Sequence, residues 1–262
     1  MRELLRRAFS DIASALGKRS VWWALASEDI VDSHRRTMLG PVWPLLNYLM
    51  FCGVIVLILG GAPRPFNYTV YVATGLVVWL FISEVLSTSA SVFLREQSLI
   101  KGTVLPISIY VLRQTSHSAI RSLYALAGAI PLVIYSGAVP SMALLTVIPA
   151  LLLVLMTAPA VSILFGFAGV FFRDFQHIVS NAMRLLFFVT PVFWRPDGRG
   201  GVLGFVYHWN PLTHYIDIVR RPVVEGVVPT TSWVIAGAAT VLLSAAALLV
   251  LGKYSRRVVF LL

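Results

Sequence analysis

Charged residues are scarce in this sequence, and it has a single cysteine. Asp, Glu, Lys and Arg make up 12% of the 262 residues, which is about half their share of an average soluble domain. Hydrophobic residues make up 58%, more than a soluble fold of this size buries. Cys52 alone excludes a disulfide-rich secreted scaffold. We therefore expect an integral membrane protein, and the long unbroken apolar runs disfavour a β-barrel.

The motifs of several kinds of site are also missing. None of the three lysines, Lys18, Lys101 and Lys253, follows the glycine spacing of a phosphate-binding P-loop. The five histidines are scattered, and no carboxylate cluster joins them into a metal site. No Gly-x-Ser-x-Gly motif is present. We expect no catalytic residue, metal or cofactor in this chain itself.

Six apolar runs are candidates to cross a membrane, which takes about 20 residues. They cover residues 39–61, 70–89, 107–135, 141–172, 177–194 and 233–252. The predicted fold class is an all-α integral membrane protein, with six transmembrane helices in residues 39–262. With the N-terminus inside, 16 Lys and Arg residues lie on the inner side and 5 on the outer side. Both termini are therefore expected in the cytoplasm. The formal net charge of +10 fits basic loops against anionic lipids better than a nucleic-acid partner.

Residues 1–38 are expected to form a cytoplasmic amphipathic segment rather than a span. Apolar residues recur there at helical spacing, with charged residues on the opposite face, as in helices that lie in the membrane interface. Trp22 and Trp23 suit the same depth, because indole rings prefer the head-group boundary. Arg35 and Arg36 follow in a polar stretch before the first span. The segment is either an anchor or a docking surface for a cytoplasmic partner.

The connection between the fifth and sixth runs, about 195–232, is far longer than a typical loop. It contains two apolar patches, 202–209 and 215–219, that are too short to span, and Asn210-Pro211 separates them. This pattern favours two short re-entrant helices covered by protein or lining a cavity. A plain surface loop is the alternative.

Charged residues also fall inside the predicted spans. Glu84 lies about 16 Å from the inner end of its helix, at 1.5 Å per residue, and Arg184 lies at a similar depth. Arg121 shares one helix face with Arg113 and His117. Because isolated charges at such depth are costly, we expect Glu84 to pair with Arg184 or Arg121. The alternative is that the arginines extend to the interface.

A set of local motifs completes the pattern. They are Leu39-Gly40-Pro41-Val42-Trp43-Pro44, Phe172-Arg173-Asp174, Thr190-Pro191-Val192, Asn210-Pro211-Leu212, and Arg220 followed by Gly226. With six spans and no nucleotide site, the chain resembles the permease subunit of bacterial ABC exporters for lipid-linked polysaccharides, of the O-antigen and teichoic-acid type. The likeness covers essentially the whole chain.

The resemblance implies partners and a location. Two copies of the chain would pair as a homodimer in the bacterial inner membrane, and two copies of a separate ABC ATPase subunit would bind ATP and Mg below them. The cargo would be an undecaprenyl-diphosphate-linked polysaccharide, moved from the cytoplasm to the outer face. Contacts with the ATPase would come from the two inner loops, at Arg95, Glu96, Gln97, Leu99, Ile100, Lys101, Arg173 and Asp174. Asn210, Pro211 and Arg220 would gate the periplasmic end.

A polysaccharide path favours aromatic rings, whose flat apolar faces meet sugar C–H groups while allowing sliding. The candidates are Tyr48, Phe51, Trp79, Phe81, Phe187, Phe188, Phe193 and Trp194. Ordinary packing and lipid contact are the alternative for each ring. Arg35, Arg36 and Arg121 are candidates to hold the diphosphate, because guanidinium matches phosphate geometry.

Other functions remain open from the sequence. A permease of the same fold could export a small drug or a lipid. A membrane-embedded enzyme acting on lipid-linked sugars would draw its catalytic groups from His214, Asp217 and Glu225. A channel or a purely structural partner would need no ATPase.

Overall fold

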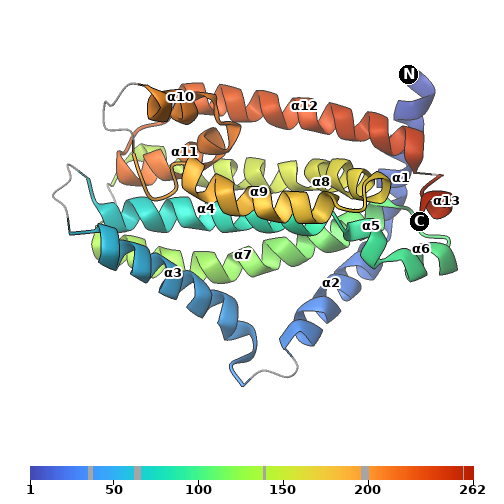
Figure 1. Cartoon of the computed structure of the whole chain (residues 1–262), viewed down its shortest axis with the longest axis horizontal. Helices are drawn as coiled ribbons and strands as arrows, with labels where there is room; N and C mark the ends of the chain where they lie inside the picture. Colours follow the sequence, from blue (N-terminus) through green and yellow to red (C-terminus); the bar gives the residue numbers. More distant parts are fainter. Residues whose placement is uncertain (35–37, 62–65, 138–139, 196–200, 256) are drawn as a thin grey trace.

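The computed structural model describes residues 1–34, 38–61, 66–137, 140–195, 201–255 and 257–262, and these ranges fold mainly into helices (Figure 1). Four helices are long and apolar enough to cross a membrane. They are α4 (Tyr68–Ser89), α7 (Ser108–Ser136), α8 (Val147–Phe171, preceded by the 3-10 turn η2, Met142–Thr146) and α12 (Thr230–Tyr254). They lie side by side along the long axis. The predicted all-α membrane fold is confirmed. Two of the arginines that the sequence analysis singled out, Arg35 and Arg36, lie outside the described residues.

The other two predicted spans are shorter helices. After the short turn η1 (Gly40–Val42), α3 (Trp43–Leu59) has 17 residues, and α9 (Phe175–Val189) has 15. A 15-residue helix is about 22 Å long, less than the hydrocarbon core of about 30 Å. Helix α9 ends five residues before the predicted end at Trp194, because proline disfavours helix at the residue before it, here Thr190. The count of six spans stays a prediction.

Two short helices occupy the long outer connection, α10 (Val202–Trp209) and α11 (Pro211–Val224). Most of α11 is buried, packed against α4, α8 and α12. Leu212 at its start lines the same cavity as Val161 of α8 and Leu243 of α12. The hairpin tip therefore reaches the middle of the long helices. The two predicted re-entrant helices are confirmed as helices, and the alternative of a plain surface loop is wrong.

The N-terminal chain forms two helices, α1 (Arg2–Gly17) and α2 (Arg19–His34). Helix α1 crosses the C-terminal end of α12 (Figure 1), and it buries Ala8 and Ala15. The two backbones approach so closely at Gly252 that a Cβ there would lie 2.2 Å from the Leu4 carbonyl oxygen. Only glycine allows this crossing.

Asp11 ties α1 to the beginning of α7. Its carboxylate accepts hydrogen bonds from the backbone N–H groups of Ile107 at 3.2 Å and Ser108 at 2.9 Å, and from the Ser108 hydroxyl at 2.6 Å. The first N–H groups of a helix lack partners within it and favour a negative charge. A residue of the polar face of α1 thus caps a long helix far away in the sequence.

The remaining short helices lie at the same end of the bundle as α1 (Figure 1). Helices α5 (Val92–Arg95) and α6 (Gln97–Gly102) connect α4 with α7, and α13 (Val258–Leu261) packs against α6 at the C-terminus.

Replacing Gly252 by alanine is expected to loosen α1. The added Cβ cannot fit against the Leu4 carbonyl, and forcing backbones apart costs about 1–3 kcal/mol. The readouts are the unfolding temperature in detergent and protease cleavage after α1. Gly237 is the matched control on the same helix, because nothing lies within 4 Å of a Cβ there. Equal behaviour of Gly252→Ala and Gly237→Ala would contradict the crossing.

Candidate functional site

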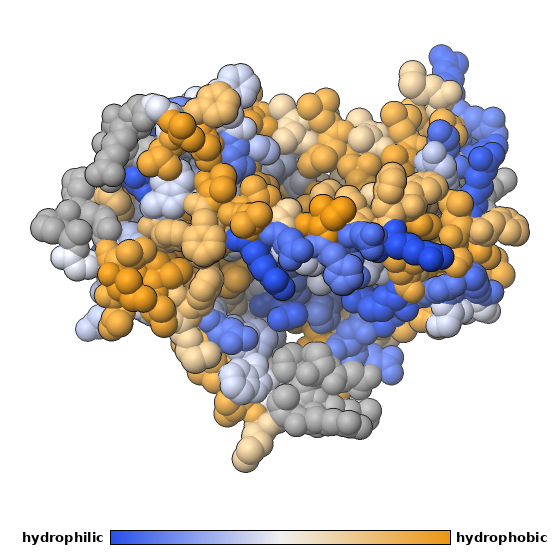
Figure 2. Space-filling model, viewed as in Figure 1, coloured by the Kyte–Doolittle hydropathy of each residue, from blue (hydrophilic) through white to orange (hydrophobic). Residues whose placement is uncertain are grey.

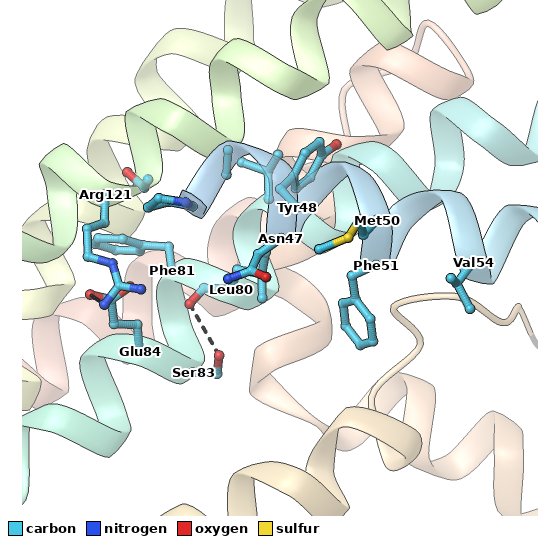
Figure 3. Close-up of a pocket in the computed structure, with 14 residues that line it drawn as sticks. Asn47, Tyr48, Met50, Phe51, Val54, Leu80, Phe81, Ser83, Glu84 and Arg121 are labelled. Atoms are coloured by element: carbon cyan, nitrogen blue, oxygen red, sulfur yellow. Dashed lines mark hydrogen bonds and ion pairs between the residues drawn. The ribbon is translucent and has the colours of Figure 1, made fainter. Parts of the chain in front are cut away.

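A cleft of about 590 Å³ lies between α3, α4 and α7 (Figure 3). Phe51 of α3 and Phe81 of α4 give it an aromatic part, with Tyr48 beside them. Glu84 of α4 and Arg121 of α7 form its polar end. The cleft is therefore amphiphilic along its length.

The charged end of the cleft keeps unused hydrogen-bonding capacity. Glu84 Oε1 lies 3.5 Å from Arg121 Nη1 and 3.8 Å from His117 Nδ1. The structure thus places Arg121, and not Arg184, beside Glu84. Both Glu84 Oε1 and Arg121 Nε are buried without a hydrogen-bond partner among the described residues. Buried polar atoms without partners are costly, so the ion pair between Glu84 and Arg121 is incompletely satisfied at this end of the cleft.

Aromatic rings continue from the cleft toward α9. The Phe51 and Phe187 ring centroids are 5.3 Å apart, and Trp79 lies 5.7 Å from Phe187. Phe188 and Phe193 join this cluster. Trp79 is 97% buried, so it packs against Phe187 but offers almost no surface to a ligand.

The remaining ring of the predicted set, that of Trp194, is bonded to the backbone of the cluster. Trp194 Nε1 donates to the Phe188 carbonyl at 2.9 Å. The structure thus brings Tyr48, Phe51 and Phe81 to the cleft, joins Phe187 to them, and leaves Trp194 beside the cluster.

A row of hydrophilic side chains follows α9 across the middle of the face shown in Figure 2. His177, Asn181 and Arg184 are exposed at one-turn spacing, and Arg173 precedes them. Lipid tails cannot satisfy such groups, so charged residues at membrane depth normally face a protein or water. This face is therefore unsuited to contact with lipid.

Sequence reasoning missed other polar residues of the cleft. Asn47 and Ser83 both line it. Asn47 is an isolated polar residue inside an apolar run, and Ser83 directly precedes Glu84 in another, which is the signal that could have identified them.

Asn210 and Pro211 organise the tip of the α10–α11 hairpin. The Asn210 side chain accepts from the Leu212 N–H at 3.0 Å, which caps α11, and it donates to Thr190 Oγ1 at 2.9 Å. Pro211 occupies the first helical position, where its missing N–H costs nothing. These two residues lie in the middle of the bundle, deeper than the periplasmic end at which they were expected to act.

Arg220 holds the irregular segment that follows α9. It is 1% exposed, and it donates to the Pro191 carbonyl and to Asp217 Oδ1, both at 2.6 Å. Its guanidinium lies 4.0 Å from the centroid of the Tyr71 ring, a favourable cation–π distance. The next carbonyls accept from tyrosines of α4, Phe193 from Tyr68 and Trp194 from Tyr71, both at 2.8 Å. Backbone carbonyls outside a helix need such donors at membrane depth.

The three residues of the enzyme alternative have separate structural partners. His214 contacts Ser232 Oγ at 3.1 Å and the His208 carbonyl at 3.0 Å. Asp217 accepts from Arg220 and from Tyr207, at 2.6 Å each. Glu225 pairs with Arg195 at 3.0 Å and Arg221 at 2.8 Å. Across the described part of the chain, no interaction links the three into one site.

The predicted ATPase contacts divide into exposed and buried residues. Arg95, Leu99 and Lys101 are exposed, whereas Glu96 and Ile100 are buried. Gln97 donates to the Leu262 carbonyl at 2.5 Å. Arg173 and Asp174 are exposed in the second inner loop. Glu96 and Ile100 are too buried to touch a partner in this structure, so they can only hold the exposed residues in position.

Comparison with known proteins gives consistent matches. Residues 20–223 match the ABC-2 type transporter family. An O-antigen export system permease protein RfbA of Klebsiella pneumoniae is 28% identical over 197 residues, which cover 73% of this chain and 75% of that protein. A second K. pneumoniae RfbA is 27% identical over 208 residues, covering 78% and 80%. RfbA of Myxococcus xanthus is 26% identical over 187 residues, covering 67% and 68%.

Replacing Arg220 by glutamine is expected to prevent stable folding. It leaves the Asp217 carboxylate and the Pro191 carbonyl buried without their donor, and breaking a buried ion pair costs about 3–5 kcal/mol. The measurement is the yield of monodisperse protein in detergent. Arg221→Gln is the matched control, since the adjacent Arg221 is 38% exposed in its pair with Glu225, which is worth about 0–1 kcal/mol. Normal yield of Arg220→Gln would show that the carbonyls have other donors.

Proposed function

The chain belongs to the ABC-2 type transporter family, and from this premise we propose that it is the membrane half of an exporter for lipid-linked polysaccharide. It is a transport subunit that spans the membrane several times. The cargo we propose is an undecaprenyl-diphosphate-linked glycan of the O-antigen type, moved to the outer face of the inner membrane. The K. pneumoniae and M. xanthus relatives are named O-antigen export system permease proteins, which supports this cargo.

The observation that carries the proposal is the amphiphilic cleft. Sugars have apolar C–H faces and polar hydroxyl edges. The rings of Phe51 and Phe81 suit the faces, while Asn47, Glu84 and Arg121 suit the hydroxyls. Binding sites of this size commonly combine apolar walls with a few polar groups. Glycan units passing along the cleft would find both kinds of contact.

The polar row on α9 supports a homodimer. His177, Asn181 and Arg184 face away from their own chain and cannot face lipid. Pairing two copies about a two-fold axis would place this row opposite its equivalent. The enclosed space would be aqueous, with the aromatic cluster and the cleft beside it.

Energy would come from a separate ATPase subunit, because this chain has no P-loop. Leu99 and Lys101 offer an apolar and a basic side chain on α6. A short helix carrying such residues suits a groove on a partner protein. The partner would bind ATP and Mg on the cytoplasmic side, where we also place both termini.

The ATPase is tested by mild-detergent purification and mass spectrometry. We expect a P-loop ATPase at a ratio of about one to one, as in other obligate hetero-complexes. Lys101→Glu should reduce both the recovery of that ATPase and its stimulated hydrolysis, because the charge of the contact is reversed. Lys253→Glu, another exposed lysine, is the control. Recovery of the chain alone, under conditions that keep other ABC complexes intact, would contradict the proposal.

The cargo is tested on α3 itself. Phe51→Ala should lower glycan export about ten-fold, because a lost ring contact weakens binding by about 0.5–1.5 kcal/mol at each sugar that passes. Leu57 lies on the same helix, is 83% exposed and does not line the cleft, so Leu57→Ala should export normally. The measurement is glycan at the cell surface in cells lacking their own permease. Unchanged export by Phe51→Ala would favour a small-molecule or lipid cargo.

A further inference from the structure

Arg113 joins three parts of the cytoplasmic end that are far apart in the sequence. Its Nε and Nη2 donate to the two carboxylate oxygens of Asp29 on α2, at 2.7 and 2.6 Å. Its Nη1 donates to Glu96 Oε2 at 2.7 Å. Glu96 is the residue between α5 and α6. A two-bond guanidinium–carboxylate contact fixes orientation as well as distance, so one side chain of α7 holds both α2 and the α5–α6 segment.

The surroundings make this link strong. The side chains of Arg113 and Glu96 are 13% and 7% exposed, and that of Asp29 is 29% exposed. Although partial burial raises the pKa of Asp29, the hydrogen bonds and charge of Arg113 hold the pKa below its ordinary value. Charged hydrogen bonds out of bulk water are stronger than exposed ones. The Asp29 carboxylate is therefore charged at neutral pH.

Helix α6 depends on such contacts for its orientation. It has six residues, too few to be stable alone. Besides Glu96, it is held by the buried side chain of Ile100 and by the Gln97 bond to the C-terminal residue. Its exposed residues, Leu99 and Lys101, lie away from these anchors.

A second link runs parallel to the first. Arg95 Nη2 donates to Gln114 Oε1 at 2.7 Å, and Gln114 Nε2 donates to Thr88 Oγ1 at 2.7 Å. This chain of bonds connects the α5–α6 segment to the end of α4 and to α7. It does not reach α2. Within the described residues, the bridge through Arg113 is what ties the segment to α2 by charged hydrogen bonds.

We propose that Arg113 is a positioning residue that makes α2 and α6 move as one unit. A displacement of α6 by the ATPase then reaches the N-terminal helices and the inner ends of α4 and α7 together. This inference rests on the proposed function, because it needs an ATPase that acts on α6. It assigns to Asp29, Arg113 and Glu96 a role in coupling ATP hydrolysis to transport, rather than in contact with either partner.

The bridge can be weakened on either side without leaving a buried charge alone. Asp29→Asn removes the charge and one of the two acceptor oxygens on α2, and it keeps the pair between Arg113 and Glu96. Glu96→Gln removes the charge on the α5–α6 side, and it keeps the pair between Arg113 and Asp29. Glu28→Gln is the matched control, since it makes the same chemical change at the exposed neighbouring residue of α2.

The experiment measures transport and ATP hydrolysis together, in vesicles containing the chain and its ATPase. We expect Asp29→Asn and Glu96→Gln each to lower the glycan transported per ATP hydrolysed about five-fold or more, as for a lost coupling between sites. The double variant should be no worse than either single one, because both cut the same bridge. Arg113→Lys should resemble them, since one ammonium group cannot span both carboxylates in the same way. Glu28→Gln should keep the wild-type ratio.

Three results would overturn the inference. One is a wild-type ratio in both single variants. Another is a parallel fall of transport and hydrolysis at an unchanged ratio, which indicates a structural role. The third is failure of Asp29→Asn to assemble with the ATPase while Glu28→Gln assembles. If the unmodified chain neither binds an ATPase nor transports glycan, the proposed function itself fails, which is a distinct outcome.

Discussion

The buried guanidinium of Arg220 is the interaction on which the rest of the structure depends. Helix α9 stops after 15 residues, and the chain continues beside α4 without helical hydrogen bonds. In a membrane that backbone must find donors inside the protein. Arg220, with Tyr68 and Tyr71, supplies them to the carbonyls of Pro191, Phe193 and Trp194. The same side chain holds Asp217, so it fastens α11 to the break and lets a helical hairpin stand inside the bundle.

The polar residues of the interior fall into two groups. Arg220, Asp217 and His214 are buried and hydrogen-bond to neighbouring side chains or carbonyls, and we expect their substitution to disturb the fold. Glu84 and Arg121 keep atoms without hydrogen-bond partners at the end of a cleft, and the polar row of α9 faces outward. The proposed polysaccharide cargo would need many weak and exchangeable contacts, and the second group lies where it could provide them. The end of the bundle that carries α2 and α6 adds a third kind of arrangement, in which Arg113 bridges two carboxylates from separate segments.

Much of this could be predicted from the sequence. The apolar runs correctly located α3, α4, α7, α8 and α12, because hydrophobic length is a local property. Asn210-Pro211 marked a real helix start, since both residues act on their own next turn. The length of the fifth predicted helix was overestimated, because Thr190-Pro191 ends the helix although the residues after it, 192–194, are still apolar. The partners of Glu96 were missed, because nothing local relates Asp29 on α2 to the middle of a loop 67 residues away.

Composition and hydrophobic runs by themselves determined that this is a helical membrane protein, and its sequence has no P-loop motif. They also determined the amphipathic start and the short helices of the outer connection, because each depends on a few neighbouring residues. Only the tertiary structure decided which charges meet. Arg121 rather than Arg184 lies beside Glu84, Arg220 reaches the Pro191 carbonyl, and Asp11 caps α7. Such pairings depend on how helices pack across long sequence separations, and side-chain spacing along one helix carries no information about its neighbour.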